Sequence, residues 1–397
     1  MVDVPREVWI TGIGIVSCLG EGPEAHWQKL MAAQPRANTT TFPPFVIHPL
    51  APTNFDAQIP KKGDQRQMEN WQRIGVYAAG LALDSAGIKG KPDILSHTDM
   101  IVAAGGGERD INVDSTILSG MPKAADPAAF LNERLMSDLR PTLFLAQLSN
   151  LLAGNISIVH GVTGSSRTFM GEESAGSEAV HIALSRIAAG QSDIALVGGS
   201  QNAERPDLLI IYQFSQMNLK DKLVPVWERS GCGAFALGSM GAFLVIEARE
   251  HAEKRGAKPL ARLTAVVSDR ANRKPGTITA SLGKLWDKLK DKIKNGHAAV
   301  LSGASGVNPA TAEEREFLGQ HSELAVRATG SYVGHGLEPT FPLNLALATL
   351  VVGHGSLFPP YDSTGLERPM CGDLSQVLVI GVGHWRGEAL ALVERVD

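Results

Sequence analysis

One segment places an acidic side chain where catalytic nucleophiles are commonly mounted. A short strand, Thr168–Met170, is predicted to turn at Gly171 and to enter a helix through small residues, so that Glu173 stands at the helix N-terminus. A side chain there lies beside free backbone N–H groups and the positive end of the helix dipole. Acids in a first helical turn also stabilise the helix itself, by about 0.3–1 kcal/mol. The spacing alone leaves both interpretations of Glu173 open.

Histidines flanked by glycine form a second group of candidates. His335 lies in Gly334-His335-Gly336, and His354 and His384 also adjoin glycines. An imidazole can act as an acid, a base or a metal ligand, although a single histidine is more often structural. No two histidines show metal-ligand spacing with an acid nearby, so we expect no metal site.

The Gly12-Ile13-Gly14 pattern follows a predicted strand, as in dinucleotide-binding turns. The third glycine of such a turn is Ser17 here, and no strand ends in an acid about twenty residues later to hold a ribose. We therefore interpret these glycines as tight strand-to-turn geometry.

Short apolar runs alternate with longer amphipathic stretches, which predicts the α/β fold that must position these residues. The predicted strands are Val8–Val16 (interrupted at Gly12 and Gly14), Met100–Ala104, Ile194–Val197, Ala242–Ile246, Ala298–Leu301, Val377–Ile380 and Ala389–Val393. The predicted helices are Gln65–Ala86, Leu143–Leu152, Ala175–Ala189 and Glu250–Arg255.

The second part of the chain repeats the order of the first. Ala298–Leu301 runs into glycines as Met100–Ala104 does, and Val377–Ile380 ends in glycines as Ile194–Val197 does. We therefore predict two α/β halves, residues 1–247 and residues 248–397. The first half carries the helix at 173–190, and the second carries His335 and the loop Gly381–Gly387.

Composition excludes several classes of protein. With a net charge of −4 over 397 residues, the chain lacks the basic surface of a nucleic-acid-binding protein. Its three cysteines are far apart, which argues against a disulfide framework and favours a cytoplasmic location. No apolar run reaches the ~18 residues of a membrane helix, and the N-terminus does not resemble a signal peptide.

At these residues the chain resembles the β-ketoacyl-acyl-carrier-protein synthases, the condensing enzymes of fatty-acid and polyketide synthesis. Trp9–Ser17 is similar to the family's opening strand, Ala78–Gly87 to its first long helix, and Asn150–Gly164 to the segment before its nucleophile. Gly238–Glu247 followed by Glu250–Ala257 is similar to the junction between its two halves. The resemblance implies the thiolase-like, duplicated αβαβα five-layer fold, a dimer, and acyl groups delivered on the phosphopantetheine of an acyl carrier protein, with no other cofactor.

The catalytic positions of the family are largely replaced in this chain. The nucleophilic Cys falls on Glu173, the first catalytic His on Gly303, and the Lys before the second His on Gly330. Only the second His remains, as His335. Condensation needs an acyl thioester on the nucleophile, whereas a carboxylate would form a water-labile mixed anhydride. Losing one donor to the developing oxyanion costs a further ~10²–10³ in rate, so we expect no normal condensing activity.

The resemblance also assigns roles around this position. The family's oxyanion hole uses the backbone N–H groups of the nucleophile and of the residue matching Val382. The loop after Val382, which is made of small residues in the family, carries His384, Trp385 and Arg386 here, and the latter two predict a narrowed or blocked entrance. The residues expected in the pocket are Ser174, Gly303, Gly330, His384 and Trp385. We expect Glu173 to fill this pocket near His335, held by backbone N–H donors.

Three functions remain open at this point. The first is a chain-length-factor-like partner subunit that pairs with a Cys-containing synthase paralogue; a homodimer is the alternative assembly. The second is a malonyl-carrier-protein decarboxylase, and the third is an acyl-thioester hydrolase or other acyl-transfer enzyme that uses Glu173 or Ser174 with His335.

Overall fold

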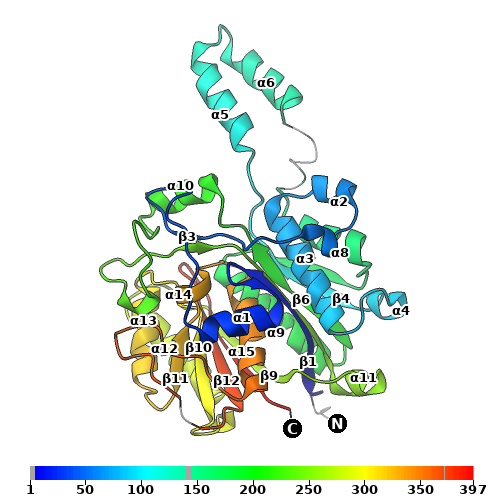
Figure 1. The fold of residues 1–397 in the computed structure, drawn as a ribbon, viewed down its shortest axis with the longest axis vertical. Coiled ribbons are helices and arrows are strands. Elements are labelled where there is room, and N and C mark those ends of the chain that lie inside the picture. Colours follow the sequence, from blue (N-terminus) through cyan, green and yellow to red (C-terminus); the bar gives the residue numbers. More distant parts are fainter. Residues whose placement is uncertain (1–4, 140–144, 146, 371, 397) are drawn as a thin grey trace.

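Two halves with the same strand pairing make up the continuous sheet of this computed structural model, which describes residues 5–139, 145, 147–370 and 372–396 (Figure 1). In the first half the order is β5 (Ser166–Phe169), β4 (Asp99–Ala103), β6 (Ile194–Gln201), β8 (Met240–Ala248) and β1 (Val8–Ser17). In the second it is β11 (Ala325–Ala328), β10 (Ala298–Ser302), β12 (Gln376–Val382), β13 (Glu388–Glu394) and β9 (Ala261–Asp269). In both halves the three outer strands are parallel and the two inner ones antiparallel, and β1 pairs with β9 where the halves join.

Helices cover both faces of each half-sheet. Along β6, Ala195 and Val197 point to one hydrophobic cluster while Ile194 and Leu196 point to another, as the two-residue period of a strand requires. The first cluster contains the helices α9 (Glu173–Ala188) and α15 (Thr340–His354), which lie between the halves. The outer layers are α3 (Asn70–Ser85) with α8 (Leu151–His160), and α12 (Thr277–Asp287) with α13 (Ala310–Gly319). The predicted five-layer αβαβα fold is confirmed.

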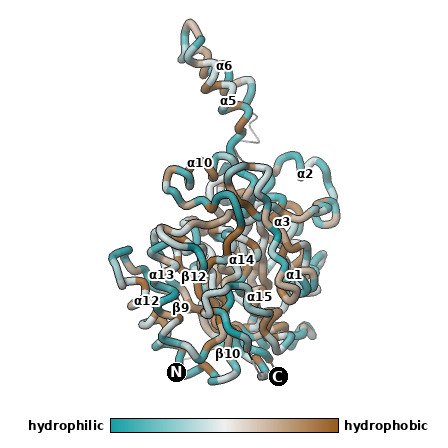
Figure 2. The backbone as a smooth tube through the Cα atoms, turned by 60° about the vertical axis from the view of Figure 1, so that its left-hand side comes forward, coloured by the Kyte–Doolittle hydropathy of each residue, from teal (hydrophilic) through white to brown (hydrophobic). Residues whose placement is uncertain are grey.

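A helical hairpin projects away from this body (Figures 1 and 2). It consists of α5 (Ile111–Gly120) and α6 (Pro127–Ser137), whose N-termini are capped by the side chains of Asp110 and Asp126. No residue of α6 is buried against the rest of the chain. Besides four short 3-10 helices (Phe55–Ala57, Met121–Lys123, Val226–Glu228 and Lys290–Lys292), the described chain contains α1 (Gly22–Met31), α2 (Lys62–Arg66), α4 (Pro92–Leu95), α10 (Pro206–Phe214), α11 (Arg249–Lys254), α14 (Gly330–Val333), β2 (Gly20–Glu21), β3 (Ile47–His48) and β7 (Leu237–Gly238). None of the described helices has the length and apolar character needed to cross a membrane.

Two of the predicted helices differ from the observed ones. The helix predicted from Gln65 begins at Asn70, because a separate short helix, α2, precedes it. Of the helix predicted over 143–152, residues 143, 144 and 146 lie outside the described residues. The described helix in this region begins at Leu151 and passes through Gly154 to His160, so the predicted end at Leu152 is wrong. The division into 1–247 and 248–397 stays a prediction; it falls at the end of β8.

The glycines at 12 and 14 lie inside β1 and form no turn, which corrects the sequence-based interpretation. They allow α3 to lie directly on the strand. A Cβ atom on Gly14 would come within 2.1 Å of the carbonyl oxygen of Ala78, and one on Gly12 within 2.5 Å of that of Ala82. Because the obstacles are backbone atoms of a buried helix, no side chain can be accommodated without moving the helix.

Replacing Gly14 by alanine should therefore destabilise the protein. We expect Gly14→Ala to lower the free energy of unfolding by about 1–3 kcal/mol, the usual cost of overpacking a core. Gly283→Ala is the matched control, because Gly283 lies inside α12 and a Cβ there meets nothing within 4 Å. This control should stabilise the protein by roughly 0.5–1 kcal/mol. Urea unfolding measures both, and equal effects of the two variants would contradict the close approach of α3.

Candidate active site

A sharp turn mounts Glu173 at the start of α9. After β5 the chain passes through Gly171 at φ 134° and Glu172 at φ 53°, ψ −135°, and α9 begins at Glu173. A positive φ at a non-glycine residue such as Glu172 costs free energy and is characteristic of functional sites. The turn directs the next side chain inward, so that Glu173 is only 7% exposed. The elbow predicted from the sequence is thus present.

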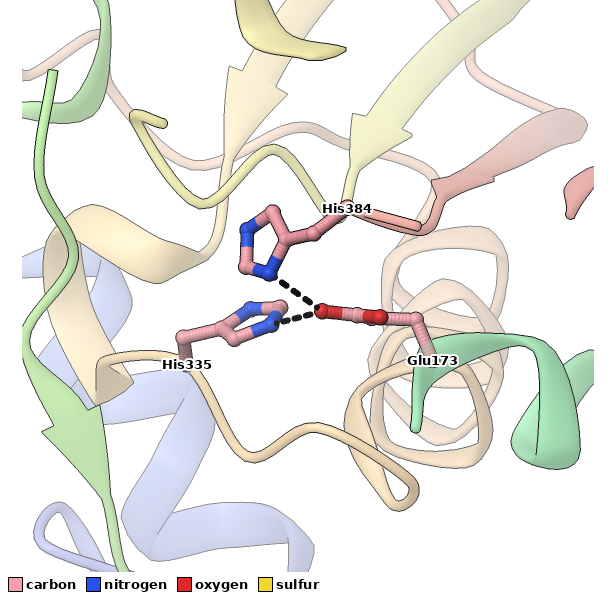
Figure 3. A group of neighbouring side chains, drawn as sticks. All are labelled: Glu173, His335 and His384. Carbon is pink, nitrogen blue, oxygen red and sulfur yellow. Dashed lines mark hydrogen bonds and ion pairs between the residues drawn. The ribbon is translucent and has the colours of Figure 1, made fainter. Parts of the chain in front are cut away.

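Two histidines converge on one oxygen of this carboxylate (Figure 3). Nε2 of His335 lies 2.7 Å from Oε1 of Glu173, and Nδ1 of His384 lies 3.0 Å from the same oxygen. His335 follows α14, and its backbone is held by hydrogen bonds to Ala236 and Gly238. His384 lies in the loop between β12 and β13. The structure therefore brings together two predicted catalytic residues and one predicted pocket residue.

The cluster is buried and its carboxylate is ionised. Burial opposes the charge of Glu173, but the two imidazoles outweigh it and hold the pKa of the carboxyl well below its usual range. Burial lowers the pKa of His335 despite its carboxylate partner, so that ring is neutral and donates Nε2–H to Glu173. Glu173 was expected to be held by backbone N–H groups, but the donors observed are the two imidazoles.

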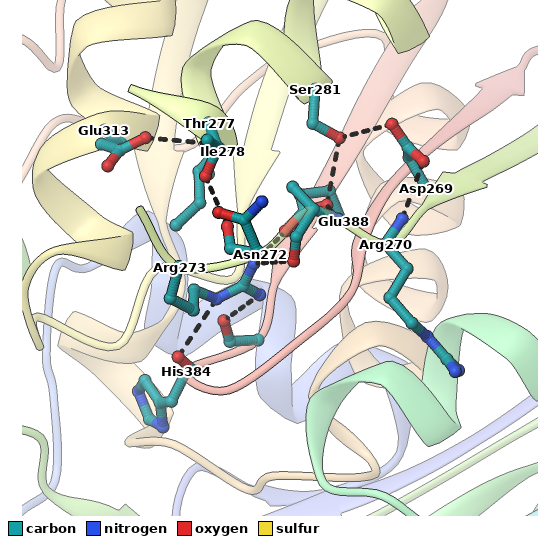
Figure 4. Close-up of polar contacts among 12 residues, drawn as sticks. Asp269, Arg270, Asn272, Arg273, Thr277, Ile278, Ser281, Glu313, His384 and Glu388 are labelled. Carbon is teal, nitrogen blue, oxygen red and sulfur yellow. Dashed lines mark hydrogen bonds and ion pairs between the residues drawn. The ribbon is translucent and has the colours of Figure 1, made fainter. Parts of the chain in front are cut away.

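The loop that carries His384 is held by an ion pair between the half-buried Arg273 and the buried Glu388 (Figure 4). Arg273 donates hydrogen bonds to the carbonyl oxygens of Gly383 (2.7 Å) and His384 (3.2 Å) and to Oε1 of Glu388 (2.6 Å). Glu388 is 1% exposed and also accepts a hydrogen bond from Ser281. Arg273 and Glu388 thereby fix the position of His384. Sequence reasoning missed them, because no local pattern links residue 273 to residue 388.

Ser174 does not meet His335, contrary to one of the hypotheses from the sequence. Its hydroxyl donates to the carbonyl oxygen of Gly171 at 2.8 Å, within the elbow. A Cβ on Gly387 would lie 2.6 Å from that of Ser174, so the serine is pressed under the Gly381–Gly387 loop. This geometry gives the hydroxyl of Ser174 no base to activate it.

Gly303, Gly330 and Val382 form tightly packed backbone around the site. A Cβ on Gly303 would lie 3.1 Å from the carbonyl oxygen of Ile380, and one on Gly330 would lie 2.9 Å from that of Ala304. Placing a histidine or lysine at these positions therefore requires the neighbouring backbone to move. Val382 is the last residue of β12, opposite Glu388 of β13. Its proposed part in an oxyanion hole stays a prediction.

Trp385 was expected in the pocket, but its side chain is 53% exposed. The narrowing or blockage of the entrance by this loop stays a prediction. Arg386 does lie at the surface of the site, with its guanidinium 3.8 Å from the carboxylate of Glu172. Together with Met170, Ser174 and Arg270, among others, it lines an open groove of about 370 Å³.

The histidine spacing in the sequence did not reveal a cluster of possible metal ligands, whereas the expected absence of a metal site stays a prediction. One donor atom from each of Glu173, His335 and His384 lies within 4.8 Å of the others, and all three side chains are buried. Two histidines and a glutamate form a ligand set known for zinc. The spacing rule failed because the three ligands come from segments far apart in the sequence. In the observed arrangement both imidazoles donate N–H groups to the carboxylate, and a metal would have to replace those two protons.

The sequence analysis missed two further residues of this region, Ser305 and Glu338. Ser305, in the loop after β10, has its Oγ 2.6 Å from Nε2 of His384. Glu338, three residues after His335, is 4% exposed, and burial together with Glu173 and Glu172 raises the pKa of its carboxyl to about 7. Ser305 lies two residues after Gly303, the position that the family resemblance matches to the first catalytic histidine. A search for hydroxyls near that position could have found it.

The ion pairing of Glu173 predicts a particular pH dependence of stability. The unfolded protein binds a proton on Glu173 near pH 4.5, whereas the folded protein, with its lowered pKa, does not. The stability contributed by this group is therefore present above about pH 4.5 and lost as the pH falls through the folded pKa. At pH 7 the wild type should exceed Glu173→Gln by about 1.5–3 kcal/mol in unfolding free energy, the range for hydrogen bonds to charged groups.

Urea unfolding from pH 7 to pH 3 measures this difference, which should narrow below about pH 4.5. The exposed Glu316 supplies the control variant, Glu316→Gln, which should follow the wild type at every pH. A constant gap between the wild type and Glu173→Gln across the whole range would refute an ionised, paired Glu173.

Comparison with known proteins agrees with this architecture. The model of the β-ketoacyl synthase N-terminal domain matches residues 5–251. The 3-oxoacyl-(acyl-carrier-protein) synthase 2 of Vibrio cholerae is 24% identical over 264 residues, which are 64% of this chain and span only 60% of that relative's length. The ishigamide ketosynthase/chain length factor superposes with a TM-score of 0.81 at 18% identity, covering 99% of this chain and all of that one. A type II polyketide ketosynthase solved with its acyl-carrier protein superposes with a TM-score of 0.73 at 17% identity, with coverage of 99% and 100%. Since the family model covers well over half of the sequence, the chain belongs to the β-ketoacyl synthase family.

Proposed function

We propose that this chain is a non-condensing, chain-length-factor-like partner subunit of a Cys-containing β-ketoacyl synthase. It would act in cytoplasmic fatty-acid or polyketide chain assembly, on acyl groups carried by the phosphopantetheine of an acyl carrier protein. The observation that carries the proposal is the ionised Glu173, which stands on the elbow of the nucleophile and is held there by His335 and His384.

The chemistry of this group argues against condensation. An acyl group on Glu173 would be a mixed anhydride, which water cleaves readily, so it could not wait for a second substrate. The two imidazole N–H groups that would stabilise an enolate oxygen are already occupied by the carboxylate. The site is therefore filled by its own side chains, which suits a subunit that shapes an acyl path without forming the bond.

The surface of the molecule supports a partner of the same fold. β5 forms the outer edge of the first half-sheet and pairs only with β4 among the described strands, which leaves a row of backbone groups open. Large apolar side chains are also exposed in the first half of the chain: Leu118 of α5, Met136 of α6, Ile158 of α8, Met170 after β5, and Ile210, Ile211 and Phe214 of α10. Of these elements, α8 contacts β5 and Met170 directly follows it, so a partner chain at this edge would cover exposed apolar surface.

A malonyl-carrier-protein decarboxylase is the less favoured alternative. Burial and the neighbouring Glu173 raise the pKa of the Glu172 and Glu338 carboxyls, whereas the pKa of Glu173 itself is held low, so this carboxylate is ionised. The malonyl group arrives with its own carboxylate, which this cluster would repel. The chain should therefore bind malonyl-carrier protein weakly, although this is the substrate that a decarboxylase must bind.

Co-expression tests the partnership directly. The tagged chain should co-purify in a one-to-one complex with a Cys-containing β-ketoacyl synthase encoded by the same organism. The double variant Leu118→Asp, Met136→Asp should abolish co-purification, because charges would be buried at the proposed interface. Met31→Asp is the control, since Met31 is also exposed (41%) but lies on α1. If the two synthase-fold chains never associate, the proposed function fails.

The purified chain alone should neither elongate nor decarboxylate malonyl-carrier protein. We expect condensation and CO2 release to stay at least ~10²–10³-fold below those of the Cys-containing partner, the cost of removing even one oxyanion donor. Glu173→Cys should not restore activity, because Gly303 still supplies no imidazole. Radiolabelled malonyl-carrier protein measures both reactions, and elongation by the isolated wild-type chain would contradict the proposal.

A further inference from the structure

The imidazole of His384 lies between the hydroxyl of Ser305 and the carboxylate of Glu173, which is the order of a hydrolytic triad. Oγ of Ser305 lies 2.6 Å from Nε2 of His384, and Nδ1 of the same ring lies 3.0 Å from Oε1 of Glu173. These are the ring atoms used in serine hydrolases, where Nε2 faces the nucleophile and Nδ1 faces the acid. The three residues come from three separate loops or helix ends, so no local sequence motif contains them.

The two ring nitrogens of His384 face the two groups that a proton relay needs. Nδ1 lies 3.0 Å from the carboxylate of Glu173, and Nε2 lies 2.6 Å from Oγ of Ser305. Oγ of Ser305 also accepts the backbone N–H of Val307 at 3.2 Å. When His384 carries its proton on Nδ1, the lone pair of Nε2 can accept the proton of the Ser305 hydroxyl.

The surroundings favour reactivity. Ser305 is 5% exposed and His384 7%, and the ring of Phe235 stacks on His384 with the centroids 5.4 Å apart. Electrostatic interactions are stronger in such a water-poor site. Arg229 donates to the carbonyl oxygen of Ser305, and its Nη2 is buried with no hydrogen-bond partner in the described part of the chain. A positively charged donor for a developing oxyanion thus lies next to the serine.

We propose that Ser305 is an acyl-accepting nucleophile that, with His384 as base and Glu173 as the acid orienting it, hydrolyses acyl thioesters. Oγ attacks the thioester carbonyl carbon while its proton passes to Nε2 of His384. The tetrahedral intermediate collapses, the C–S bond breaks, and the leaving thiolate takes the proton from Nε2. Water then attacks the acyl-serine ester and gives a proton to Nε2 of His384. The C–O bond to Oγ breaks as Oγ takes that proton from Nε2, which releases the carboxylic acid and restores both Ser305 and His384.

This activity is independent of the partner role, since it needs neither condensation nor a second subunit. Such a site would remove acyl groups that reach the chain and cannot be elongated. It also differs from the hydrolase considered from the sequence, in which Ser174 was the nucleophile, because the hydroxyl of Ser174 is bonded to a backbone carbonyl.

Covalent labelling of the full-length chain tests the proposal. Methyl and hexyl fluorophosphonates are incubated with the wild type, and the modified peptide is identified by mass spectrometry, alongside hydrolysis of octanoyl-N-acetylcysteamine. We expect one adduct on Ser305, and at least a ~10³-fold loss of hydrolysis in Ser305→Ala, the range for removing a triad nucleophile. Ser177→Ala is the matched control, because Ser177 is equally buried at 5% and bonds only within α9. Its labelling and hydrolysis should match those of the wild type.

Two further measurements make each outcome decisive. Ser305→Cys, alkylated with iodoacetamide and mapped by peptide, reports whether reagents reach position 305. Wild-type protein that stays unlabelled at Ser305 overturns the proposal: if the cysteine is alkylated, the serine is accessible but not activated, and if it is not alkylated, an acyl substrate cannot reach position 305. Circular dichroism confirms that Ser305→Ala is folded, and hydrolysis that persists in this folded variant also overturns it. So does a stoichiometric zinc ion in the purified protein lost on Glu173→Gln, because the metal would occupy Nδ1 of His384.

Discussion

A single buried oxygen atom holds this site together. Oε1 of Glu173 accepts hydrogen bonds from His335 and His384, and the three residues belong to α9, the segment after α14 and the loop after β12. A carboxylate removed from water costs several kcal/mol unless charges or donors compensate it. Two N–H donors on the same oxygen supply that compensation. The buried carboxylate of Glu173 and the imidazole of His384 therefore depend on each other, because neither would keep its partner if the other were removed.

The elbow that carries Glu173 explains why an acid is tolerated there. The positive φ of Glu172 and the N-terminus of α9 are geometry suited to presenting a reactive side chain, and the helix dipole favours a negative charge at this end. A thiolate and a carboxylate are both anions stabilised by such a position. The carboxylate of Glu173 is bonded to two imidazoles, and in the proposed hydrolysis the nucleophile is the hydroxyl of Ser305, on the other side of His384.

The sequence predicted the strands well because their apolar runs and terminal glycines are local signals. It also predicted the meeting of Glu173 and His335, but only through the family resemblance. The contacts of His384 with Ser305 and with Arg273 lie 79 and 111 residues apart and leave no periodic trace. Gly14 was misread for a related reason, since the helix that requires it is more than sixty residues away. Local patterns define elements, whereas the site is made by the ends of elements that only the packing brings together.

The site lies between the two halves of the fold, which have the same strand order. Each half has the same five-strand order, and α9 and α15 fill the layer between them. Glu173 starts the helix contributed by the first half, while His335, His384 and Ser305 all come from the second. Neither half contains the acid together with its imidazoles. Because β1 and β9 join the halves within one sheet, any motion that separates them breaks the Glu173 hydrogen bonds as well. The chemistry of the chain is therefore a property of the interface between the two halves and depends on both being folded against each other.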